Sequence, residues 1–118
     1  GWSAIALTLD VHHLDPLRSG AREIAELRRR LLDLGLAVAI ETGARFVLDP
    51  RRKHRPTLLD PAPAGRARRL DFLRRCADIA GELGSTCLSF WAGTPEPDSE
   101  RERCWAWLLE GIDALLAH

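Results

Sequence analysis

Two histidines and two aspartates fall within six residues near the start of the sequence. Asp10, His12, His13 and Asp15 follow a largely apolar run at residues 4–9. A neutral imidazole can bind a divalent metal ion, act as a general base or hydrogen-bond a substrate. We interpret this cluster as a ligand-binding segment, with His12 or His13 as a weaker candidate for metal ligation. The alternative is a turn whose histidine packs against a neighbouring loop.

A second candidate is the carboxylate that ends the apolar run at residues 36–40. Glu41 closes this run and Arg45 follows four positions later. An isolated charge at the end of a buried strand is costly, so the carboxylate must be hydrogen-bonded, paired or metal-bound. Two interpretations stay open: a structural pair between Glu41 and Arg45, or a direct role in holding a polyhydroxy substrate or a metal.

The segment after Arg45 ends in a basic run at residues 51–55, which includes Lys53 and His54. Clustered cations can bind a phosphate group. The run has no glycine-rich or helix-start geometry, so a solvated loop face explains it equally well.

An aromatic pair marks the third candidate. Trp91 follows Phe90 directly and Gly93 comes two residues later. A tryptophan at the end of a strand offers a flat apolar wall on which a sugar can stack, and glycine lets the backbone turn close to a ligand. Core packing is the alternative for Trp91, and it is what we expect for Phe90. For Trp105 we expect packing in the core or between helices.

The elements that must position these residues follow from the hydrophobic pattern. Strands are expected at residues 4–10, 36–41 and 86–90, and 3.6-residue periodicity predicts helices at 16–34 or 19–34, 66–83 and from 98 or 99 to 116. Gly35 and Gly84 each follow a helix-closing leucine, where a left-handed glycine commonly ends a helix. The βαβαβα order predicts an α/β fold with parallel strands, in which ligands bind outside the carboxyl ends of the strands. The long strand-to-helix loops carry all three candidate segments.

Composition describes an ordinary globular chain. Of its 118 residues, 46% are hydrophobic and 29% are charged, and 17 basic residues balance 17 acidic ones. No overall charge favours nucleic acid or an anionic membrane, and no apolar run approaches a membrane span. The three cysteines lack metal-binding spacing, so we expect reduced thiols and a cytoplasmic protein.

The sequence contains no methionine and begins with Gly1 directly before a strand. By analogy with Gly35 and Gly84, we expect Gly1 to follow a helix that this chain lacks. The chain would then begin inside a larger repeating βα architecture.

Several stretches resemble the sugar phosphate isomerase/epimerase family of the xylose isomerase-like TIM barrels, a superfamily that includes endonuclease IV and the ketose 3-epimerases. They are HHLDP, IETGARFVLDPRRKHRPTLLD, RRLDFLRRCADIAGELG and SFWAGTPEP. The resemblance implies that residues 1–118 form a single partial domain, units two to four of a (β/α)8 barrel. It also implies that the catalytic carboxylates and most metal ligands come from strands five to eight, beyond this chain. We therefore expect the chain alone to be inactive.

The resemblance implies a metal-dependent sugar or sugar-phosphate isomerase or epimerase, which transfers a proton next to a carbonyl with Mn, Mg, Co or Zn. A small-molecule sugar is the expected partner, nucleic acid and membranes are not, and self-association of the fragment is a further expectation. One alternative is an endonuclease IV-like enzyme, although Glu41 stands where that branch has a histidine. Another is a non-catalytic barrel that binds a small polar ligand. The residues expected to bind substrate are His12, His13, Glu41, Arg45, Lys53, His54 and Trp91.

Overall fold

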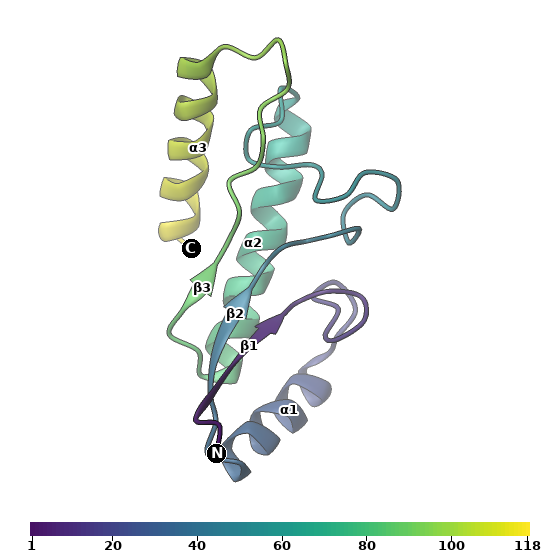
Figure 1. Ribbon diagram of the computed structural model, residues 1–118, viewed down its shortest axis with the longest axis vertical. Helices are drawn as coiled ribbons and strands as arrows, with labels where there is room; N and C mark the ends of the chain where they lie inside the picture. The colour runs from purple at the N-terminus through teal and green to yellow at the C-terminus, as the bar shows by residue number, and fades with distance from the viewer. The chain divides into compact units, whose positions relative to one another are not determined.

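The computed structural model describes all 118 residues, and strands alternate with helices along the chain (Figure 1). The order is β1 (Ala4–Thr8), α1 (Ala21–Asp33), β2 (Ala37–Glu41), α2 (Pro63–Leu83), β3 (Leu88–Ser89) and α3 (Arg101–Leu116). This confirms the predicted α/β class and βαβαβα order, and it is consistent with a partial TIM barrel. No helix is both long enough and apolar enough to cross a bilayer.

The three strands form one parallel sheet in the order β1-β2-β3, with β2 in the middle. Ala4 lies opposite Ala37, and Thr8 lies opposite Glu41, which in turn lies opposite Ser89. The carboxyl ends of the strands therefore lie in one row, as expected for a sheet that presents ligand-binding loops at this edge.

Side-chain alternation gives this sheet two unlike faces. Because partners in register share a face, Ile5, Leu7, Val38, Ile40 and Leu88 lie on one side. The opposite face carries small or polar side chains, which are exposed or half-buried. They are Ala4, Ala6, Thr8, Ala37, Ala39, Glu41 and Ser89.

The chain divides into two compact units. The first unit comprises Gly1–Gly43 and Arg75–Phe90, and the second comprises Ala44–Arg74 and Trp91–His118. The first contains the sheet, the loop after β1, α1 and the last part of α2. The second contains most of the loops after β2 and β3, the rest of α2, and α3.

The apolar core of the first unit comes from its strands and helices together. Ile24 and Leu31 of α1 are buried, as the predicted stripe requires, and so are Ile40 of β2 and Ile79 of α2. Leu34 was expected in the same stripe but is 69% exposed, because the helix ends at Asp33 and Leu34 is its C-cap. The helix therefore contributes two buried side chains and not a continuous row.

In the second unit the core lies between the long loop and two helices. Leu58, Phe72 and Cys104 are buried there. Trp105 is not a core residue, since it is 54% exposed, so of the two expected kinds of packing the core is ruled out. None of the three cysteines forms a disulfide, and Cys76 and Cys104 are buried while Cys87 is exposed.

Two helix ends match the sequence prediction, and the start of the third helix does not. Gly35 and Gly84 adopt φ values of +63° and +77°, which confirms them as left-handed helix stops. At the start of α3, however, the N-cap is Glu100 and no side chain caps the helix. Ser99, one of the two predicted starts of this helix, lies in a turn before it, where its N–H donates to the carbonyl of Glu96.

Candidate functional site

Each unit brings together part of the predicted site. His12, His13 and Glu41 belong to the first unit. The second unit holds the other four expected residues, which are Arg45, Lys53, His54 and Trp91.

In the first unit, Asp10 organises the loop that carries the histidines. Its Oδ1 atom accepts the backbone N–H groups of His12 at 2.9 Å and His13 at 3.0 Å, and it lies 2.8 Å from Nδ1 of the His13 ring. Asp10 is buried, whereas the His13 side chain is 61% exposed. The predicted cluster is therefore a turn built on Asp10 that presents an imidazole to solvent.

Three donors on one oxygen also stabilise the charge of Asp10. Burial by itself would raise the pKa of this carboxyl, but the backbone N–H of His12 and the ring and backbone N–H of His13 together lower the pKa below its ordinary value. The carboxylate is therefore ionised at neutral pH and can only accept hydrogen bonds.

The far end of the same loop is anchored by Arg75 of α2. Its guanidinium donates to the carbonyls of Pro16 and Ser19, each at 3.1 Å. Both ends of the histidine-bearing loop are thus fixed to buried or helical structure.

Glu41 ends β2 and is exposed, not buried. Its Oε2 accepts a hydrogen bond from Thr8 Oγ1 at 3.1 Å, across from it in β1. Beside it Thr42 is buried and donates its hydroxyl to the carbonyl of Ser89 at 2.9 Å. Thr8 therefore supplies the hydrogen bond that the strand-end carboxylate was expected to need, and Glu41 keeps its second carboxylate oxygen for other donors. Arg45 lies in the other unit, so the expected Glu41–Arg45 pair stays a prediction.

In the second unit, the loop between β2 and α2 folds back on itself. The His54 N–H donates to the carbonyl of Arg45, and three residues without glycine's freedom, Ala44, Arg45 and His54, have positive φ. Left-handed backbone at such residues is uncommon and concentrates at functional sites. The fold therefore brings Arg45 and His54 together.

His54 also contacts the aromatic residue of the next loop. The two rings form a T-shaped pair, with 5.4 Å between ring centroids and 69° between ring planes. Trp91 is 43% exposed, so part of its surface stays accessible beside this contact. The second and third candidate segments therefore meet at this ring pair.

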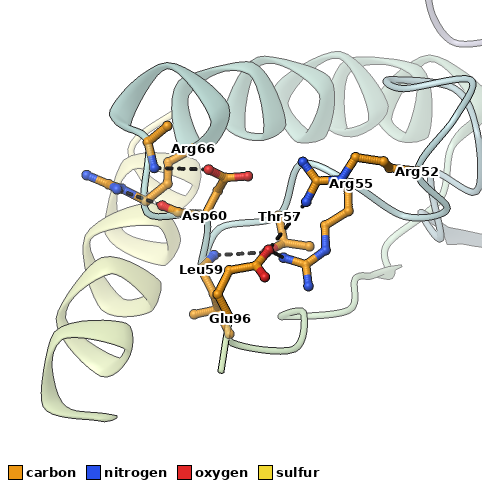
Figure 2. A network of polar contacts seen from close by, with 8 residues as sticks. Arg52, Arg55, Thr57, Leu59, Asp60, Arg66 and Glu96 are labelled. Atoms are coloured by element: carbon orange, nitrogen blue, oxygen red, sulfur yellow. Dashed lines mark hydrogen bonds and ion pairs between the residues drawn. The ribbon is translucent and has the colours of Figure 1, made fainter. Parts of the chain in front are cut away.

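Glu96 forms ion pairs with the basic run, although the sequence did not single it out. Glu96 Oε1 lies 2.9 Å from Arg55 and 3.3 Å from Arg52 (Figure 2). Arg55 is only 18% exposed, so its charge needs this partner. No local motif identifies Glu96, because it lies more than forty residues from its arginines.

Lys53 is exposed and has no ion pair, and the same holds for Arg45 and Arg51 in the same unit. It is the only lysine of the chain and precedes His54 in the sequence. An exposed cation of this kind can bind an anionic group without first breaking an ion pair.

The residues of this chain do not fit a complete metal site. His13 uses Nδ1 for Asp10, and no three His, Cys, Asp or Glu side chains converge anywhere in the structure. A structural or catalytic metal centre takes at least three protein ligands in most zinc proteins. We therefore assign no chemical step through a metal ion.

Comparison with known proteins gives a family and a fold. The family model described as xylose isomerase-like TIM barrel matches residues 1–118. A search of curated proteins finds no match. Among solved structures, the chain resembles a crystal structure of D-psicose 3-epimerase in the presence of D-fructose, with a TM-score of 0.73 and 18% identity. The match covers 99% of this chain and 39% of the epimerase chain.

Proposed function

The chain belongs to the xylose isomerase-like TIM barrel family, and from this we propose that it binds a sugar or sugar phosphate as part of an isomerase or epimerase. The observation that carries the proposal is the ring pair of His54 and Trp91, with the exposed Lys53 directly before His54 in the sequence. An exposed indole face suits the C–H surface of a sugar, and an adjacent ammonium suits a phosphate. The structural likeness to a sugar epimerase supports the same substrate class.

The residues of each unit then have their own roles in binding a sugar. Trp91 packs against the sugar face, and Lys53 binds the phosphate. His54 and Arg45 offer hydrogen-bond donors from the folded loop. In the first unit His12, His13 and Glu41 supply hydrogen bonds to hydroxyl groups.

We propose that the whole enzyme depends on a divalent metal ion, Mn, Mg, Co or Zn, for which the residues of this chain do not form a site. The proposal assigns no catalytic residue to this chain. We therefore expect the chain to bind the sugar without converting it.

The single lysine makes the proposal directly testable. Reductive methylation with ¹³C-formaldehyde places an NMR label on Lys53 and on the α-amino group of Gly1. We expect a ketose phosphate to shift the Lys53 signal and the Trp91 indole N–H signal, while the neutral ketose shifts Trp91 alone. The Gly1 signal is the internal control.

Two results would count against this site. If inorganic phosphate shifts Lys53 as strongly as the ketose phosphate does, the basic run binds anions without regard to the sugar. If neither sugar shifts Trp91, and Trp91→Ala leaves the Lys53 response unchanged, the ring pair is only a packing contact.

A further inference from the structure

The contact between Asp10 and His13 determines which nitrogen of the imidazole carries the proton. All three hydrogen bonds of Asp10 converge on Oδ1, and two of them come from backbone N–H groups, which can only donate. An acceptor oxygen must therefore occupy this position. The Nδ1 atom of His13 at 2.8 Å from the same oxygen must then be protonated.

With Nδ1 committed to Asp10, the neutral ring has its lone pair on Nε2. The side chain is 61% exposed, and it lines a hollow of about 190 Å³ in the first unit. The other lining residues combine carboxylates, a guanidinium and aliphatic carbons. They are Leu14, Glu23, Glu26, Leu27 and Arg30.

This set of groups matches a small polyhydroxylated ligand. Hydroxyl groups donate to carboxylates and to a neutral imidazole nitrogen, and accept from a guanidinium, while the C–H surface contacts leucine. Arg30 already reaches Glu26 at 3.4 Å, an exposed contact that costs little to exchange for a ligand.

We propose that Asp10 is a positioning residue that holds His13 in the Nδ1–H tautomer, so that Nε2 accepts a hydrogen bond from a ligand hydroxyl in this hollow. The tautomer follows from the geometry alone. Only the choice of a sugar as ligand rests on the proposed function.

The tautomer can be measured in the unmodified chain. In a protein with ¹⁵N-labelled histidine, at about pH 8.5 where an ordinary imidazole is neutral, long-range ¹H–¹⁵N correlations distinguish the protonated ring nitrogen from the bare one. The four histidines are assigned with single His→Gln variants. We expect His13 to show a protonated Nδ1 and a bare Nε2. A predominantly Nε2–H ring would overturn the proposal.

Three variants test whether Asp10 fixes the His13 tautomer directly or only by keeping the loop folded. Asp10→Ala removes the acceptor, and we expect His13 to lose its single tautomer and show the mixture of a free imidazole. Asp10→Asn keeps an oxygen that the two backbone N–H groups hold in place, so the Nδ1–H tautomer should be retained. Asp15→Ala is the matched control, since Asp15 caps the Leu17 N–H at 2.9 Å in the same loop without contacting an imidazole. If Asp10→Ala does not fold, the unmodified chain and Asp10→Asn still decide the question.

A titration with a neutral ketose then tests whether Nε2 of His13 binds a sugar hydroxyl. We expect the Nε2 signal of His13 to move with the sugar in the unmodified chain and in Asp10→Asn. If Lys53 and Trp91 respond while Nε2 does not, the role of His13 as a hydroxyl acceptor is overturned and the proposed function stands. If Nε2 responds while Lys53 and Trp91 do not, the hollow binds the sugar and the ring-pair site fails.

Discussion

At Gly93 the backbone passes so close to Thr57 that a methyl group has no room. A Cβ atom at this position would lie 2.6 Å from Cβ and Oγ1 of Thr57, and the residue has a φ of +111°. We expect Gly93→Ala to lower the free energy of unfolding by about 1–3 kcal/mol, through the strained φ and the displacement of a buried threonine. Urea denaturation measures the change.

Gly81 provides a control, because a substitution there should change stability in the opposite direction. It lies inside α2, is exposed, and has no atom within 4 Å of an added Cβ. We expect Gly81→Ala to stabilise the chain by about 0.5–1 kcal/mol. Equal effects of the two substitutions would contradict the close approach at Gly93.

The lowered pKa of Asp10 predicts how the free energy of unfolding changes in acid. Its pKa in the folded chain lies below the ordinary value of 3.8, so the stabilisation it provides is complete above that value and is lost as the pH falls through the folded pKa. We expect the difference in unfolding free energy between the unmodified chain and Asp10→Asn to shrink as the pH falls below 3.8. Urea denaturation at a series of pH values measures it, and a constant difference would contradict the prediction.

At this scale the sequence identifies candidate residues but not their partners. His13 and Trp91 could be selected because they follow apolar runs. The roles of Asp10 and Glu96 depend on hydrogen bonds and ion pairs that form only when the loops fold. A carboxylate in a polar stretch gives no local signal that it will bind two arginines elsewhere in the chain.

Among the elements, the loop after β3 and the basic loop are joined by Glu96. Glu96→Gln removes the negative charge from Arg52 and from the largely buried Arg55. We expect a loss of about 1–3 kcal/mol in unfolding free energy, mostly from Arg55, together with a weaker His54–Trp91 contact. Urea denaturation and the chemical shift of the Trp91 indole N–H report the two effects.

A matched substitution separates the contributions of the two arginines to stability. Arg52 is 55% exposed, and pairs at such positions contribute little. Arg52→Gln should therefore change stability much less than Glu96→Gln. Equal losses would show that Arg55 does not depend on its pair.

Arg66 joins the start of α2 to α3 within the second unit. Its guanidinium donates to the carbonyl of Asp60 at 2.7 Å (Figure 2) and to that of Pro61 at 3.0 Å. It also lies 4.4 Å from the ring centroid of Trp107. We expect Arg66→Ala to cost about 2 kcal/mol in urea denaturation. Arg68→Ala, at an exposed position of the same helix, should change stability by less than about 0.5 kcal/mol.

The number, type and order of the elements follow from the sequence, because the change from apolar runs to 3.6-residue periodicity is strong. Their ends depend on contacts that the pattern does not contain. β1 stops at Thr8 and not at Asp10, since the Asp10 carboxylate turns the chain by accepting the next backbone N–H groups. Similarly, α2 begins three residues earlier than predicted, at Pro63, where proline suits the first helical turn.

For the whole molecule, exposed apolar surface on α3 predicts self-association. Trp105, Leu109 and Leu116 are 54%, 55% and 80% exposed and recur at helical spacing along this helix. With a formal net charge of zero there is little electrostatic repulsion between copies. We expect an average mass that rises with concentration in light scattering, and Leu109→Glu should reduce the rise.

Leu32→Glu is the control for this prediction. Leu32 is 69% exposed but belongs to α1, in the first unit. An equal reduction by both substitutions would mean that association has no defined surface.

The small, polar face of the sheet has a consequence for how such a chain can evolve. Below the row of Thr8, Glu41 and Ser89 lie only alanines, paired Ala6 with Ala39 and Ala4 with Ala37. Substitutions in the upper row can change what the strand ends recognise without altering the apolar face that holds the sheet to its helices. Selection for a new ligand and selection for a stable fold therefore act on different faces of the same three strands.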